Sequence, residues 1–166
     1  MSADLAQTRK ERRDELLGSL IANIPYVQFL GVDFTRMGDE LTGRLNFSDK
    51  LIGNPMIPAL HGGVVSAFLE ITAQTQLTWD LVWPKLEAGG EEEEALLRGE
   101  FPRTPKTIDL TIDYLRSGRP RDAYARAFVQ KAGRRVANVR VEAWQDNRDR
   151  PIAAAHGHFL MPGEGK

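Results

Sequence analysis

One helical pattern, apolar on most of its circumference, constrains the fold of this chain more than any other feature. It opens at His61-Gly62-Gly63 and continues without a break to about Trp79. A surface helix keeps one polar face, so a helix that is apolar nearly all round has to be buried. Other elements must therefore cover it on several sides. Its apolar positions are Val64, Val65, Ala67, Phe68, Leu69, Ile71, Ala73 and Leu77.

The segments around this helix have the patterns of strands. Before it, apolar alternation predicts a hairpin with its turn at Met37–Glu40, followed by a loop over residues 48–60. From Thr107 onward the hydrophobic period switches to two, which predicts four more strands. Short connections predict that these four form an antiparallel meander. The predicted strands are 32–36, 41–47, 107–114, 124–131, 135–144 and 152–161.

This order of elements predicts an α+β fold, in which a six-stranded antiparallel sheet wraps around one buried helix. Residues 1–24 are expected to form a separate N-terminal helix, with Leu16, Leu17 and Leu20 on its apolar side. Residues 25–166 are expected to form a single domain. That domain carries a charged insert at about 84–105, part of which could form a short helix.

Composition excludes several classes of function. The chain has 166 residues, a net charge of −1 and no cysteine. It lacks the basic excess of a nucleic-acid binder, and it cannot form thiolate metal sites or disulfides. No apolar run is long enough to span a bilayer, and residues 1–20 do not resemble a secretory signal. A cytoplasmic protein without membrane contacts is expected. His156 and His158 share a strand face but have no third ligand at metal-site spacing, so no metal is predicted.

Two features around the buried helix suggest chemistry. Gly62 and Gly63 have no Cβ, and the N–H groups of a first helical turn lack intrahelical partners, so they could bind an oxyanion. Glu70 lies among apolar neighbours, where an unpaired carboxylate is costly, so it is solvated, paired or functional. His61 could act as a base or only fix the turn. Asn54 could orient a substrate or form an Asx turn before Pro55.

These residues and their order resemble the PaaI-like acyl-CoA thioesterases of the hotdog fold, within the 4-hydroxybenzoyl-CoA thioesterase-like superfamily. The resemblance covers roughly residues 25–163. It rests on the His-Gly-Gly that opens the helix, on Glu70 nine residues after His61, and on three later segments. There are three departures. The loop between Asn54 and His61 is longer, the insert at about 84–105 is also longer, and Gln74, with Thr75 beside it, stands where the family often has Ser or Thr. The segments read TIDLTIDYLR, KAGRRVANVRVEAW and RPIAAAHGHFLM.

The resemblance implies a hotdog fold and hydrolysis of an acyl-CoA to free acid and CoA, without metal or organic cofactor. It implies that Glu70 reaches across a subunit interface of a homodimer or homotetramer and acts as nucleophile or general base. Gly62 and Gly63 would form the oxyanion hole, and Gln74 and Thr75 would contact substrate. A non-catalytic acyl-thioester-binding or regulatory protein is the main alternative, and a hotdog dehydratase is a weaker one.

Charge is distributed unevenly along the chain. Residues 1–102 carry 16 acidic and 9 basic side chains, whereas residues 103–166 carry 7 and 13. Coenzyme A carries several phosphates, so arginines in the basic half are candidates for binding it. The candidates lie in two predicted turns. They are Arg116, Arg119 and Arg121 in one turn, and Arg134 and Arg135 in the other.

Overall fold

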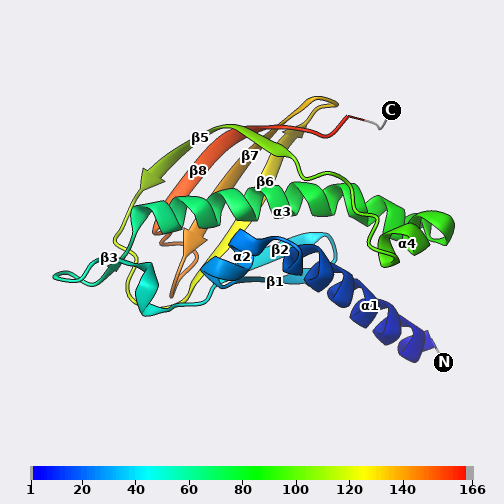
Figure 1. Ribbon diagram of the computed structural model, residues 1–166, viewed down its shortest axis with the longest axis horizontal. Coiled ribbons are helices and arrows are strands. Elements are labelled where there is room, and N and C mark those ends of the chain that lie inside the picture. The colour runs from blue at the N-terminus through cyan, green and yellow to red at the C-terminus, as the bar shows by residue number, and fades with distance from the viewer. Residues whose placement is uncertain (1, 164–166) are drawn as a thin grey trace.

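The computed structural model describes residues 2–163 and has the predicted α+β architecture (Figure 1). The sheet curves around one long helix, α3, and a second long helix, α1, precedes the sheet. The helices are α1 (Ser2–Ala22), α2 (Pro25–Leu30), α3 (Gly62–Ala88) and α4 (Gly90–Leu97), with a short 3-10 turn at Asp49–Leu51. The strands are β1 (Val32–Met37), β2 (Glu40–Leu45), β3 (Ile52–Asn54), β4 (Ala59–Leu60), β5 (Lys106–Tyr114), β6 (Ala123–Ala132), β7 (Val136–Trp144) and β8 (Ala153–Leu160).

The six main strands are antiparallel and lie in the order β1-β2-β6-β7-β8-β5. The predicted four-strand meander is therefore wrong for its first strand. Strand β5 pairs with β8 at one edge, and β6 pairs with β2 in the interior. Crossing from β5 to β6 takes the chain past two strands, or ~14 Å at ordinary strand spacing. The connecting residues 115–122 are long enough to span it, at ~3.3 Å each.

The core lies between the sheet and α3, which contacts β2, β5, β6, β7 and β8. The buried face of β7 consists of Ala137, Val139, Val141 and Ala143, whose side chains are fully inaccessible to solvent. These small residues leave room for the large side chains of the helix, such as Phe68 and Trp79. The alternating apolar residues of β7 and the apolar side chains of α3 thus pack against each other.

Helix α3 is longer than the sequence pattern predicts and continues through Pro84 to Ala88. A proline inside a helix removes one backbone hydrogen bond. Pro84 is exposed, whereas Val82 and Leu86 on either side of it are buried, so packing of the apolar stripe carries the helix onward. The rest of the charged insert contains α4, which agrees with the short helix suggested for this region.

The segment 48–60 is not the irregular loop that was predicted, because β3 and β4 pair within it as a small separate hairpin. This hairpin projects beyond the N-terminal end of α3 (Figure 1). Met56 and Ile57 lie at its tip and are 88% and 70% exposed. The C-terminal half of α1 packs against β1 and α2 and buries Leu16, Leu17, Leu20 and Ile21. Over residues 2–163, no helix combines the length and apolar character needed to cross a membrane.

Candidate active site

His61 caps the N-terminus of α3. Its Nδ1 accepts a hydrogen bond of 2.9 Å from the Gly63 N–H, so the imidazole satisfies one of the donors that the first turn leaves open. Gly53 packs directly against it, and a Cβ at residue 53 would lie 2.7 Å from the His61 Cα. This geometry agrees with the hypothesis that His61 fixes the turn at the start of the helix, rather than acting as a base.

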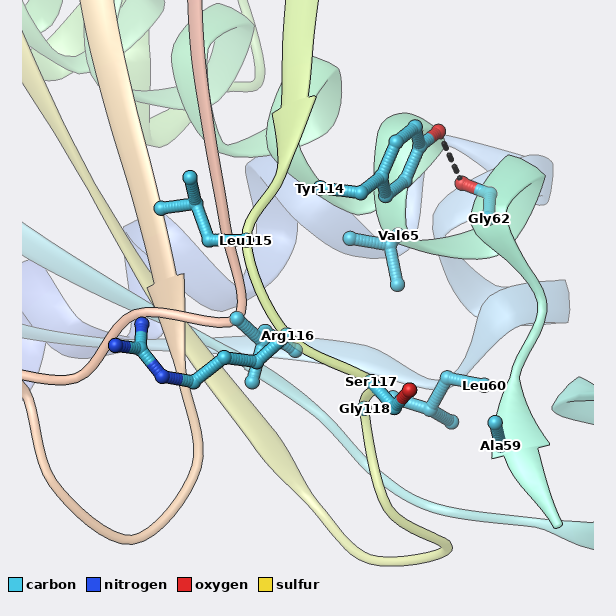
Figure 2. Close-up of a pocket in the computed structure, with 10 residues that line it drawn as sticks. Ala59, Leu60, Gly62, Val65, Tyr114, Leu115, Arg116, Ser117 and Gly118 are labelled. Atoms are coloured by element: carbon cyan, nitrogen blue, oxygen red, sulfur yellow. Dashed lines mark hydrogen bonds between the residues drawn. The ribbon is translucent and has the colours of Figure 1, made fainter. Parts of the chain in front are cut away.

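The Gly62 N–H is the donor that remains open, since no acceptor for it is found among the described residues. Gly62 borders a hollow of about 500 Å³ at the start of α3 (Figure 2). Tyr114, at the end of β5, closes one side of this hollow and donates a hydrogen bond of 2.9 Å to the Gly62 carbonyl. A strand end and a hydroxyl thus hold the first turn of α3 in place, with one backbone donor free for a ligand.

Glu70 is half-buried and belongs to a chain of hydrogen bonds that links α3 to β5. The Thr107 hydroxyl donates to Glu70 Oε1 at 2.5 Å, and the Gln74 amide donates to the Thr107 oxygen at 3.1 Å. Within residues 2–163, the second carboxylate oxygen of Glu70 has no hydrogen-bond partner. Two side chains therefore orient Glu70 and leave one oxygen for a substrate or a water.

Thr107 is the site residue that sequence reasoning missed. Strict alternation places it on the outer face of β5 with Asp109 and Thr111. The pairing of β5 with β8 shifts between Thr107 and Asp109, which inserts Ile108 as an extra residue. A bulge of this kind turns the preceding side chain to the other face. Gly157 on β8 accommodates the bulge, because a Cβ there would lie 2.4 Å from the Asp109 carbonyl oxygen.

The two halves of the predicted site lie apart within one protomer. Gly62 and Glu70 are eight residues apart on the same helix, a rise of ~12 Å. One thioester carbonyl cannot sit within ~3 Å of both the Gly62 N–H and the Glu70 carboxylate across such a separation. A single chain therefore supplies an open backbone donor at one point of α3 and an oriented carboxylate at another.

Asn54 and Thr75 occupy different settings. The Asn54 side-chain oxygen accepts from the backbone N–H groups of Met56 and Ile57, at 3.0 and 3.4 Å. This is the Asx turn that the sequence analysis left as an alternative. Thr75 is 5% exposed and lies in the wall of a cavity that also includes Glu70 and Gln74. Gln74 and Thr75 are thus brought to Glu70, whereas Asn54 is not.

The candidate phosphate-binding arginines are not brought together in the protomer. Arg116 lines the hollow beside Gly62, but its guanidinium points away from Gly62 and donates to the Pro151 carbonyl at 2.8 Å (Figure 2). Arg121 pairs with Asp146 at 2.7 Å. Arg134 and Arg135 lie beyond the opposite end of β6, ~30 Å away at the rise of a ten-residue strand. Arg116 and Arg119 therefore lie near the N-terminal end of α3, whereas Arg134 lies at the opposite end of the sheet.

The two histidines of β8 do not join this site. His158 Nδ1 lies 3.0 Å from the Asp109 carboxylate on the neighbouring strand. This hydrogen bond holds the pKa of Asp109 below its ordinary value. His156 lies opposite Thr111 and is exposed. Within the described part of the chain, no three histidine or carboxylate side chains gather as a ligand set.

Comparison with known proteins identifies the family of this chain. The family model for the acyl-CoA thioesterase N-terminal domain matches residues 53–160. The medium/long-chain acyl-CoA thioesterase YigI of Escherichia coli K12 is 32% identical over 154 residues, which cover 91% of this chain and 95% of that protein. The corresponding protein of Salmonella typhimurium is 30% identical with the same coverage.

Solved structures agree with this relationship. A Chromobacterium violaceum protein is 31% identical, with a TM-score of 0.63 and coverage of 96% of this chain and 99% of its own. The PaaI protein from the phenylacetic acid degradation operon of E. coli is only 15% identical, yet it shares the fold at a TM-score of 0.68, with 93% and 96% of the two chains covered. This chain therefore belongs to the acyl-CoA thioesterase family and shares the hotdog fold of PaaI.

Proposed function

We propose that this protein hydrolyses acyl-CoA thioesters with Glu70 as the catalytic carboxylate. The observation that carries the proposal is the setting of Glu70. One carboxylate oxygen accepts from Thr107, and the other has no hydrogen-bond partner among residues 2–163 and lies beside a largely apolar cavity. An oriented carboxylate with one free oxygen suits attack on a carbonyl or activation of a water.

Two subunits would complete one site. The ~12 Å between Gly62 and Glu70 on α3 suggests that the carboxylate of one protomer works with the helix N-terminus of another. The face of α3 between them carries Gly63, Ser66 and Ala67, which are not fully buried and are small enough for a second α3 to approach closely. Antiparallel packing of two α3 helices about Ser66 would place Gly62 of each beside Glu70 of the other.

Edge strand β5 supports this assembly. Over residues 2–163 no strand pairs with its outer side, and such an edge is a template for pairing. Three apolar side chains on or beside it are about half exposed: Ile108 (55%), Tyr114 (57%) and Leu115 (49%). A two-fold axis that pairs β5 with its copy would cover these residues. The proposal is therefore an obligate homo-oligomer built from such dimers.

The reaction needs no group beyond those of the two chains and water. In the general-base route, Glu70 takes a proton from a water whose oxygen attacks the thioester carbonyl carbon. The Gly62 N–H of the partner subunit stabilises the oxyanion. When the tetrahedral intermediate collapses, the C–S bond breaks and the proton passes from Glu70 to the CoA thiolate. In the nucleophilic route, Glu70 attacks the carbonyl carbon, the C–S bond breaks and CoA leaves as a thiolate. Water then hydrolyses the resulting anhydride, which restores the Glu70 carboxylate, frees the acid and supplies the proton taken up by the thiolate.

Gly62 is the preferred oxyanion donor in this proposal. The Gly63 N–H already donates to His61 Nδ1, so it serves the helix cap. The same hydrogen bond occupies Nδ1 of His61, so the imidazole cannot act as a base through that nitrogen. This disfavours a dehydratase that relies on that histidine. Arg116 and Arg119, at the same end of the molecule, would attract the phosphates of CoA at the surface. The relatives named above suggest medium-chain or long-chain acyl groups.

A thiol-release assay across saturated acyl-CoA substrates tests the proposal. Hydrolysis releases one free CoA thiol per turnover, which a thiol reagent detects. A binding or regulatory module would bind acyl-CoA without releasing thiol. A dehydratase would change the absorbance of a 3-hydroxyacyl-CoA or enoyl-CoA without releasing thiol. Sedimentation at micromolar concentration tests the assembly, because a stable, fully active monomer would contradict the shared site.

A further inference from the structure

A cavity of about 280 Å³ lies beside Glu70 on the side of α3 that faces α1 and α2. In Figure 1, α2 and the end of α1 lie below α3, whereas β5 lies above it. Glu70 thus stands between Thr107 on one side and this cavity on the other. Six apolar side chains contribute to the walls: Leu20, Ile21, Ile24, Val27, Ala67 and Ile71.

The cavity extends from the Glu70 carboxylate toward the C-terminal part of α3. Its α3 wall runs from Ala67 to Thr78, so Glu70 lies near the end closer to the helix N-terminus. From Glu70 the wall continues for eight residues, a distance of ~12 Å. A thioester carbonyl placed at Glu70 would therefore point its acyl chain along this cavity. The CoA end would leave in the opposite direction, toward a helix N-terminus.

Two of the polar side chains in the wall, Gln74 and Thr78, are hydrogen-bonded within the protein, and the hydroxyls of Tyr26, Thr75 and Thr104 are its other uncharged polar groups. The Thr78 hydroxyl donates to the Gln74 carbonyl at 2.8 Å, and the Gln74 amide donates to Thr107 at 3.1 Å. Glu70 is the one charged residue among those that line the cavity. Beyond the carboxylate, the walls are therefore uncharged, and aliphatic side chains make up half of the lining residues. Such a lining favours an aliphatic chain over a polar or charged acyl group.

We propose that this cavity holds the aliphatic acyl chain of the substrate and that Ile24, which lines it at the elbow between α1 and α2, limits the space available to that chain. The inference rests on the proposed function and adds the place where the acyl chain lies and a specificity-determining residue. A methylene is about the size of a water molecule, which occupies ~30 Å³, so the cavity holds roughly nine methylenes. This corresponds to a medium-chain acyl group. The N-terminal helix thereby becomes part of the substrate site.

The test measures kcat/KM by thiol release for butanoyl-, octanoyl-, dodecanoyl- and hexadecanoyl-CoA. In the parent protein kcat/KM rises by up to about fourfold per added methylene, because burying one methylene is worth ~0.8 kcal/mol. The rise ends at about dodecanoyl-CoA. Ile24→Trp fills the elbow side of the cavity and lowers the dodecanoyl-to-butanoyl ratio of kcat/KM at least tenfold.

Two further variants make the test decisive. Ile24→Ala enlarges the cavity and raises the hexadecanoyl-to-dodecanoyl ratio, so it decides the matter if circular dichroism shows that Ile24→Trp is unfolded. Met37→Trp is the matched control. It adds the same ring at the β1–β2 turn, on a side chain that is 76% exposed and does not line this cavity. This control keeps the chain-length profile of the parent.

The outcomes separate this inference from the proposed function. If the parent releases thiol from every substrate at similar kcat/KM, the cavity assignment is overturned while the thioesterase function stands. A rising profile that both Ile24 variants leave intact also overturns the assignment. If no acyl-CoA of any length releases thiol, the proposed function fails and this inference fails with it.

Discussion

The Thr107 hydroxyl donates a hydrogen bond to the Glu70 carboxylate, although the two residues are 37 positions apart and belong to different elements. The contact fixes the orientation of Glu70 without neutralising it, since the carboxylate is the acceptor. Removing the hydroxyl should leave the carboxylate in place but less well ordered. Thr107→Val, which keeps the shape of the side chain, should therefore lower kcat about 10-fold or more, because misplaced catalytic groups are costly. Steady-state kinetics of thiol release measure the effect.

Thr107→Ser provides the rescue for this variant, because it restores the hydroxyl without the methyl group. It should recover most of kcat. Thr111→Val makes the same change on the exposed outer face of β5 and should behave as the parent does. Equal losses of kcat in Thr107→Val and Thr107→Ser would show that packing rather than the hydrogen bond matters at this position.

His61 should contribute to stability through its hydrogen bond with the Gly63 N–H. Loss of an N-cap side chain costs ~1 kcal/mol, so His61→Ala should lower Tm by ~2–4 °C in a chain of this size. Asparagine is a good N-cap residue, and His61→Asn should lower Tm less. Thermal unfolding followed by circular dichroism measures both. Identical Tm values for the parent and His61→Ala would contradict the capping role.

Asp80 should make stability depend on pH in a direction that the structure fixes. Burial raises the pKa of Asp80 above the ordinary carboxyl value, and the hydrogen bond from Gln76 opposes this only in part. A carboxyl group whose pKa is raised by folding stabilises the folded state fully at pH values below its unfolded-state pKa of ~3.9. That stabilisation is lost as the pH rises through the pKa of the folded state. Ionised Asp80 therefore weakens the fold at neutral pH.

Asp80→Asn should then raise Tm at pH 7, because the amide carries no charge and its oxygen can still accept from Gln76. The gain relative to the parent should shrink as the pH falls toward 4, where Asp80 of the parent becomes protonated. Thermal scans of both proteins at several pH values measure this difference. A gain that is the same at pH 7 and at pH 4 would show that desolvation of Asp80 is not its cause.

Arg119 should act on KM rather than on kcat. Attraction between a surface arginine and a phosphate is screened by salt, so KM for acyl-CoA should rise between low salt and ~0.5 M salt, where the Debye length is only a few Å. Arg119→Gln should raise KM at low salt and flatten this dependence. Lys131→Gln removes one charge at the far end of β6 and serves as the control. A parent KM that does not change with salt would identify Arg119 as an ordinary surface charge.

Local patterns predicted most of the fold and failed where long-range pairing decides. The apolar circumference of α3 and the alternation in β7 each report on burial, which side-chain types encode directly. The turn residues after β5 indicate only that the chain bends. Gly118 and Pro120 suit a tight turn and a crossover equally well, so these residues do not indicate that β5 pairs with β8. The helical stretch beyond Trp79 was missed because Pro84 outweighed the buried positions around it.

The candidate site shows the same division. Glu70 stands out in the sequence because a carboxylate among apolar neighbours needs a reason. Thr107 does not stand out, because a bulge at Ile108 decides which way it points. The signal that could have found the bulge is Gly157 in the opposing strand, where a side chain would strike the Asp109 carbonyl. The separation of Gly62 from Glu70 follows from helix geometry alone and could have been calculated from their spacing.

Turnover by Glu70→Gln tests the central claim most directly. The substitution is nearly isosteric and can still accept the Thr107 hydrogen bond, so folding and acyl-CoA binding should persist while kcat falls ~10²–10⁴-fold. Glu94→Gln, the same change on the exposed surface of α4, should keep the kcat of the parent. The measurement is steady-state thiol release at saturating acyl-CoA, with circular dichroism confirming the fold. A folded Glu70→Gln protein that releases thiol at the rate of the parent would contradict the account.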